Sequence, residues 1–248
     1  MAIAAFLIVV FLGSYIQSVA GFAMAMLIVA VMGGFRLVEL PVLAATVSLL
    51  TMVNVALALR GSLGQIQGRV FVWLAVGQVP AILIGVYIMQ WLDANVLTGL
   101  EICLGLFITL GGLFMLLKPQ PWKQVAGRTA CVGTGVAGGL MGGLFGASGP
   151  VLGWFGFSQP LPLAAIRATL LACFALTTVV RTGVVWSSGG LTAEVLSLAL
   201  LGAPVVVVGT LAGRYLAPPV HESAIKRMAH MLLLAMGIWI LLRALLGV

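Results

Sequence analysis

Two groups of small and polar residues interrupt long apolar stretches, and they are the strongest candidates for binding chemistry in this chain. The first group, residues 17–21 (Gln-Ser-Val-Ala-Gly), lies near the middle of an uncharged stretch over residues 2–33. The second, residues 145–150 (Phe-Gly-Ala-Ser-Gly-Pro), lies near the middle of an uncharged stretch over residues 129–157. A helix of about 30 residues would be roughly 45 Å long, too long for one membrane crossing and too short for two. We therefore expect each stretch to be a broken helix or a re-entrant hairpin.

The second group predicts the start of a new half-helix. Pro150 suits the first turn of a helix, and Ser148 and Gly149 suit the cap before it. The unpaired N–H groups and the positive dipole end of such a helix favour an anion. The alternative is a flexible kink whose backbone groups are satisfied by neighbouring helices. At the equivalent break of the first stretch, the polar and small residues are Gln17, Ser18 and Gly21.

Polar residues also occur inside the apolar span that follows each broken stretch. In the first half they are Thr46, Ser48, Thr51 and Asn54, and in the second half Thr169, Thr177, Thr178 and Arg181. Ser and Thr in membrane helices usually bond to their own backbone or to a neighbouring helix. From these spans we expect Asn54, Thr177 and Arg181 to supply side-chain contacts to an anion. Arg181 has no acidic residue nearby in sequence, although it could also extend outward to the membrane surface.

Other motifs do not predict an enzyme or a cofactor site. Residues 133–138 match G-x-G-x-x-G, but no strand precedes them and no acidic residue follows at the required distance, so we interpret these glycines as close helix packing. The sequence contains no H-E-x-x-H and no G-x-S-x-G motif. Cys103, Cys131 and Cys173 stand singly in apolar runs, which predicts neither a metal site nor a disulfide. We expect no cofactor, no metal and no catalytic residues.

Composition places the chain in a lipid bilayer. Hydrophobic residues make up 62% of the 248 residues and charged residues only 7%, too few to cover the surface of a water-soluble domain. The net charge of +7 comes from Lys and Arg in short loops and at helix ends, so it indicates membrane orientation rather than nucleic-acid binding. The first apolar stretch resembles a signal peptide, but no Lys or Arg precedes Arg36, so we do not expect cleavage.

The chain repeats itself at an offset of about 124 residues. Corresponding positions include Pro80 with Pro204 and Gly85 with Gly209. We expect one transmembrane domain over residues 1–248, with repeat 1 at about 1–118 and repeat 2 at about 128–248. Each repeat would hold one broken element and three spans, at about 40–59, 70–92 and 96–117 in the first half and 164–186, 195–216 and 226–246 in the second. A linker rich in proline and charge, residues 118–123, separates the halves.

Charge counting favours re-entrant hairpins over full crossings. If both broken elements return to their side of entry, nine of the twelve Lys and Arg residues share one side, against Arg36, Arg181 and Arg243 on the other. If both elements cross, the division is seven to five. The first division follows the positive-inside rule. It leaves three crossings per half, so the predicted fold is an all-α membrane protein of two inverted repeats.

These features together resemble the sulfite exporter TauE/SafE family, also called the TSUP transporters. The resemblance rests on the duplicated halves, on SVAGFAMAM at 18–26, on GGLMGGLFGASGPVLG at 138–153, and on the helices that contain Pro80 and Pro204. The family implies a bacterial inner-membrane carrier of sulfite, sulfonates or other small organic anions. Matched onto this chain, it implies a site at the two breaks, around Ser18 to Phe22 and around Gly146 to Pro150.

We therefore expect alternating-access transport of a small anion. Two alternatives are a membrane-embedded enzyme that modifies lipid, for which no nucleophile or acid–base pair is visible, and a non-transporting membrane subunit. The sequence leaves open the direction of transport, its coupling to H⁺ or Na⁺, and whether the chain forms a homodimer. Glu101 and His230, each about one turn inside its span, are the candidates for proton coupling.

Overall fold

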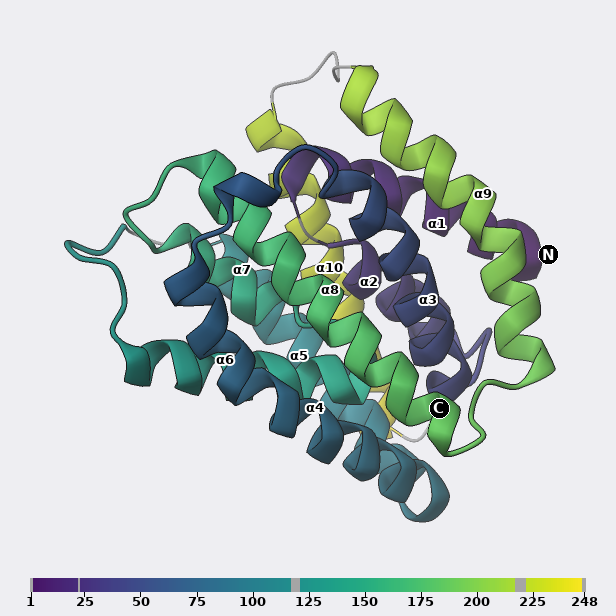
Figure 1. Ribbon diagram of the computed structural model, residues 1–248. Coiled ribbons are helices and arrows are strands. Elements are labelled where there is room, and N and C mark those ends of the chain that lie inside the picture. Colours follow the sequence, from purple (N-terminus) through teal and green to yellow (C-terminus); the bar gives the residue numbers. More distant parts are fainter. Residues whose placement is uncertain (1, 22, 117–120, 217–221, 247–248) are drawn as a thin grey trace.

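The computed structural model describes residues 2–21, 23–116, 121–216 and 222–246 (Figure 1). Within these residues, all regular secondary structure is helical. The first half contains α1 (Ala2–Ala20), α2 (Met24–Ile28) with the π-helical turn η1 (Val29–Gly33), α3 (Leu40–Ala58), the 3₁₀ turn η2 (Leu63–Gln65), α4 (Gly68–Asn95) and α5 (Leu97–Leu116). The second half contains α6 (Arg128–Phe145), α7 (Gly149–Phe157), α8 (Leu163–Ser187), α9 (Ala193–Tyr215) and α10 (Glu222–Leu246). The prediction of an all-α membrane protein is confirmed.

Both predicted breaks are present, and a helix lies at each of the six predicted spans. The first stretch divides between Ala20 and Met24, a few residues after the expected centre, and the second divides between Phe145 and Gly149. Five helices within the described residues are long and apolar enough to cross a bilayer, namely α3, α4, α5, α8 and α9. The polar linker contributes residues 121–127 to the structure as non-helical chain, while its residues 118–120 lie outside the described part.

The two halves exchange helices with each other. The most extensive pairing joins α4 of the first half to α6 of the second, and its counterpart joins α9 of the second half to α1 of the first. Helix α3 packs against α8 and α9, and α8 packs against α3 and α4. Two mixed groups result, which we call bundle A (α1, α2, α3 and α9) and bundle B (α4, α6, α7 and α8). Figure 1 shows bundle A around α9 at the upper right and bundle B around α4 and α6 at the lower left.

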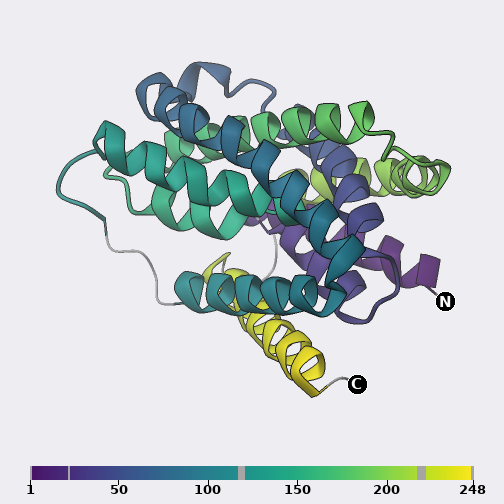
Figure 2. The same cartoon turned by 90° about the horizontal axis from the view of Figure 1, so that it is seen from below.

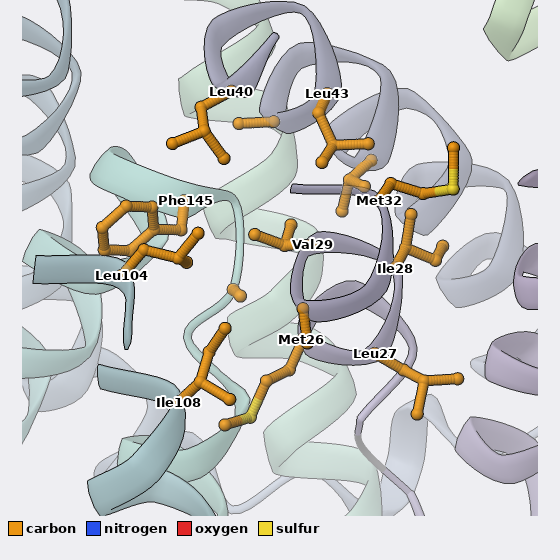
Figure 3. Packing of buried hydrophobic residues seen from close by; sticks show 14 of the residues in the cluster. Met26, Leu27, Ile28, Val29, Met32, Leu40, Leu43, Leu104, Ile108 and Phe145 are labelled. Carbon is orange, nitrogen blue, oxygen red and sulfur yellow. The ribbon is translucent and has the colours of Figure 1, made fainter. Parts of the chain in front are cut away.

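Helices α5 and α10 pair with each other and form a separate layer (Figure 2). A core of apolar side chains connects this layer to the bundles. Met26 and Val29 of the short α2–η1 segment lie between α3, α5 and the end of α6, and Phe145 stacks on Phe107 of α5 with ring centroids 5.7 Å apart (Figure 3). The short half-helix is therefore enclosed by protein on several sides, as irregular backbone at membrane depth requires.

Glycines allow the paired helices to touch through their backbones. A Cβ atom on Gly135 or Gly139 of α6 would overlap the carbonyl oxygen of Leu74 or Gln78 of α4. On the other side of the molecule, a Cβ atom on Gly213 of α9 would lie 2.7 Å from the carbonyl oxygen of Tyr15. Small residues at such contacts are the usual means of close association in lipid, where apolar burial gives helices no preference for each other. The interpretation of the glycines in residues 133–138 as close helix packing is confirmed for Gly135 and Gly138, while Gly133 has nothing near its Cβ position.

We expect Gly135→Ala to destabilise the protein, because the added methyl group meets backbone that cannot rotate away. Overpacking of this kind costs roughly 1–3 kcal/mol of unfolding free energy. Gly133 is a matched control two residues away on α6, exposed and with nothing near its Cβ position. Gly133→Ala should be neutral or slightly stabilising, because Ala is the better helix former by about 1 kcal/mol. Thermal unfolding midpoints in detergent test the pair, and equal midpoints would contradict the packing role of Gly135.

Candidate functional site

A chain of side-chain hydrogen bonds holds the first break. The Gln17 side-chain oxygen accepts from the backbone N–H of Met24, the first residue of α2, at 3.1 Å. The Gln17 amide nitrogen donates to the side-chain oxygen of Asn54 on α3 at 2.6 Å, and the Asn54 amide donates to the Thr210 hydroxyl on α9 at 2.7 Å. Asn54 and Gln17 are both buried. The Gln17 and Asn54 amides hydrogen-bond to each other, and Gln17 also bonds to the first N–H of α2. Buried polar groups in an apolar medium require such partners.

The backbone of the first break adopts a left-handed conformation at two residues. Gly21 has φ 87°, and Ala23 has φ 101° although it is not glycine. On the α1 side, Ser18 donates to the carbonyl oxygen of Thr210 at 3.0 Å, and an Arg167 nitrogen on α8 donates to the Val19 carbonyl oxygen at 3.0 Å. These bonds supply partners to helix ends whose backbone groups would otherwise face a hydrophobic medium.

The second break leaves the start of α7 without a side-chain cap. Gly146 ends α6 in the left-handed conformation at φ 68°, with its N–H bonded to the Gly142 carbonyl oxygen at 2.9 Å. Ser148 occupies the N-cap position of α7, as the sequence predicts, but its hydroxyl makes no capping bond. Instead it lies 3.5 Å from the Thr177 hydroxyl of α8. The side chain of Gln78 on α4 donates to that same Thr177 hydroxyl and, at 3.1 Å, to the Cys173 carbonyl oxygen.

A small pocket lies between the two breaks. Both breaks contribute to its wall, together with α2, α3 and α8. The Thr51 hydroxyl on α3 is buried, lines this pocket and has no hydrogen-bond partner in the described part of the chain. The lining residues are Gln17, Ala23, Ala25, Met26, Thr51, Gly146, Ser148, Gly149, Phe174, Thr177 and Thr178.

The predicted binding residues fall into three groups. Those that line the pocket are Gln17, Gly146, Ser148, Gly149 and Thr177. Those outside its wall are Asn54, which bonds to Gln17; Ser18, which bonds to α9; Gly21, beside the Arg167 side chain; Pro150, beside Gly111 of α5; and Arg181. The remaining prediction, Phe22, lies outside the described residues.

Arg181 is completely buried and bonded on all three of its nitrogens. It donates to the Gly143 carbonyl oxygen at 3.1 Å, to the Ser48 hydroxyl at 3.1 Å and to the Met89 sulfur at 3.5 Å. The side chain therefore does not extend to the membrane surface, which was one of the two outcomes that the sequence allowed. It connects the end of α6 in bundle B with α3 in bundle A.

Sequence reasoning did not single out four residues that shape this region. Thr51 and Thr178 were visible as polar residues of their spans but had no signal that separated them from Thr46 or Thr169. Gln78 and Thr210 stand alone in apolar helices α4 and α9. Their role depends on the exchange of these helices between the halves, which no local pattern indicates.

The arrangement defines a class of protein before any comparison is made. Apolar helices that enclose a small polar pocket between two broken helices are the architecture of a membrane transporter. The comparisons agree. The sulfite exporter TauE/SafE family matches residues 5–240, and the chain belongs to this family. Among curated proteins, the probable sulfite/organosulfonate exporter TauE of Cupriavidus necator is 38% identical over 232 residues, covering 94% of this chain and 91% of the relative. No solved structure matches the chain.

Family membership identifies the protein as a transporter rather than an enzyme. Within the described residues, no group of three His, Cys, Asp or Glu side chains could hold a metal ion. The polar groups that line the pocket are hydroxyls, the Gln17 amide and backbone groups, all of which can donate or accept hydrogen bonds.

We expect Gly146→Ala to destabilise the second break. An L-residue in the left-handed conformation costs about 1–2 kcal/mol, and the new Cβ would lie 3.0 Å from the Ala44 carbonyl oxygen. Gly183→Ala on α8 is the control, because nothing lies near its Cβ position. The thermal midpoint of the first variant should fall and that of the second should not. Unchanged midpoints for both would show that the turn at Gly146 is not under this constraint.

Proposed function

We propose that the protein exports sulfite or an organosulfonate across the bacterial inner membrane, and that the pocket between the breaks binds the anion. The observation that carries the proposal is the unpaired, buried Thr51 hydroxyl in a pocket that also receives the uncapped start of α7 at Gly149. A donor without a partner in an apolar medium costs free energy, and an oxyanion would relieve that cost. The name of the Cupriavidus necator relative supports the choice of substrate.

The pocket suits a small oxyanion because its donors come from several directions. Thr51 on α3, Ser148 at the second break and the backbone N–H groups at the start of α7 surround one space. A sulfite or sulfonate group carries three oxygens and can accept from all of these. The apolar neighbours Ala25, Met26 and Phe174 would contact the carbon end of a sulfonate.

Transport would proceed by alternating access, with bundles A and B as the moving bodies. The sequence repeats suggest a movement of one half against the other, but α4 and α9 are exchanged, so each bundle contains helices from both halves. Within each bundle the close glycine contacts resist relative movement. Between the bundles lie the pocket and the α3–α8 packing, where hydrogen bonds such as that of Ser48 with Arg181 can break and re-form.

An inverted arrangement of the two halves is consistent with the helix pairing. The main pairings that join the halves have counterparts with the roles exchanged, namely α4–α6 with α1–α9 and α3–α9 with α4–α8, as a pseudo-twofold axis requires. The charge count placed Arg36 and Arg243 on the outer side. The Arg243 side chain donates to the Gly34 carbonyl oxygen at 2.7 Å, in the same turn that carries Arg36. Both cations therefore lie at one end of the molecule, which supports that assignment.

Glu101 is a less favourable carrier of a coupling proton than its sequence position suggested. It forms two hydrogen bonds with Arg36, at 2.6 and 2.7 Å. These bonds raise the pKa of Arg36, so the guanidinium remains charged and continues to hold the carboxylate.

We expect Thr51→Val to lower the affinity for [³⁵S]sulfite in proteoliposome transport by roughly tenfold or more, the effect of losing a hydrogen bond to a charged group. Valine keeps the branched shape and removes only the hydroxyl. Thr46→Val is the matched control: its hydroxyl on the same helix is also buried and unpaired within the described residues, but it does not line the pocket. An equal loss in both variants, or in neither, would argue against the pocket as the site.

A cross-link between α1 and α9 distinguishes movement of bundle A against bundle B from movement of one sequence repeat against the other. A Cβ atom on Gly209 would lie 3.2 Å from the Cβ of Ser14, slightly closer than the roughly 3.5–4.5 Å of a disulfide, and 2.9 Å from the Phe11 carbonyl oxygen, so α1 and α9 must separate slightly to accept the pair. We expect Ser14→Cys with Gly209→Cys, in a Cys103→Ser background, to transport at a similar rate when oxidised or reduced. The cross-link joins the two sequence repeats but stays within bundle A. Inhibition on oxidation that reverses on reduction would show that the repeats themselves move apart.

A further inference from the structure

The buried guanidinium of Arg181 carries a positive charge that none of its bonded partners cancels. A carbonyl oxygen, a hydroxyl and a thioether sulfur accept from it, and all three are neutral. The side chain is 0% exposed, so water does not screen it. A charged side chain in this position is expensive and is retained at functional sites in membrane proteins.

Arg181 stands one layer behind the wall of the pocket. It does not line the cavity, but its Ser48 partner lies 3.4 Å from the Cβ position of the pocket residue Gly146. Its second partner, Gly143, lies on the last turn of α6, three residues before that same glycine. The guanidinium is thus fixed next to the second break without occupying the space of a ligand.

We propose that Arg181 determines specificity from outside the pocket, by making it select anions over neutral molecules of the same shape. This inference rests on the proposed function and goes beyond it, because it assigns the discrimination to a residue that the ligand does not touch. In a medium of low dielectric constant the field of an unpaired charge extends over several ångströms. An anion in the pocket would offset the cost of burying the guanidinium, whereas a neutral ligand would not.

A purely structural role would give a different pattern of effects. If Arg181 served only to tie α6 to α3, then removing its Ser48 partner would harm binding about as much as removing Arg181, and lysine would not restore function. If the charge matters, lysine at 181 would retain much of the affinity, and loss of the Ser48 hydroxyl would matter little. The effect of each substitution on binding, rather than on stability, therefore distinguishes a structural role of Arg181 from a role of its charge.

The experiment measures [³⁵S]sulfite binding to purified wild type, Arg181→Gln, Arg181→Lys and Ser48→Ala, each checked for a monodisperse, folded state. We expect Arg181→Gln to bind about tenfold or more weakly, and the other two variants to stay within about threefold of wild type. Wild-type affinity for Arg181→Gln, or an equal loss in all three variants, would overturn the proposal.

A competition experiment on the wild-type protein does not depend on whether a variant folds, because it changes the ligand and not the protein. Methanesulfonate and methanesulfonamide have similar shapes, and only the first is an anion at neutral pH. We expect the sulfonate to displace sulfite and the sulfonamide to compete at least about tenfold more weakly. Equal competition would overturn the role of Arg181 while leaving the pocket as the sulfite site. Failure of wild type to bind either sulfite or methanesulfonate would remove the proposed function and this inference with it.

Discussion

The close approach of helix backbones at glycine is the constraint on which the rest of this structure depends. In lipid, moving an apolar side chain from the acyl chains to a neighbouring helix gives no gain in free energy. The fit of the surfaces and the contact of backbones therefore decide which helices associate. Glycines of α6 place its backbone against α4, and glycines of α9 do the same against α1. These two contacts define the bundles, and the bundles bring both broken helices to one pocket.

The two breaks differ in whether their helix ends have partners from elsewhere in the chain. At the first break the partners are side chains, with Gln17, Asn54 and Thr210 connecting three helices. At the second break the start of α7 lacks such a cap, and a pocket with an unpaired Thr51 hydroxyl lies beside it. The two breaks therefore differ in hydrogen bonding as well as in sequence: the first is satisfied by side chains, and the second leaves the start of α7 without a side-chain partner.

Much of the fold could be predicted from the sequence because its signals are local. Apolar length, the Ser148–Pro150 start of α7 and the spacing of proline and glycine each act within one or two turns, and every predicted element is present. Ser148 and Gly149 of the candidate site could be predicted for the same reason, because they stand at the start of a helix. Gln78 and Thr210 could not be identified, because their contacts depend on which helices pair. Arg181 was recognised as unusual, but its distance from the pocket depends on the depth and rotation of α8.

The exchange of α4 and α9 also bears on how the chain is assembled in the membrane. Helix α1 is synthesised first, but its packing partner α9 begins only at Ala193. The contacts of Ser14 and Ser18 with α9 can therefore form only after most of the protein has been inserted. A chain that ended after α5 would hold neither α6 nor α9, and its α1 and α4 would keep uncovered glycine and serine faces. Such a half-length chain could complete its packing only by pairing with a second copy of itself. The α4–α6 and α1–α9 pairings seen within one chain are the contacts that such a dimer would form between its two copies.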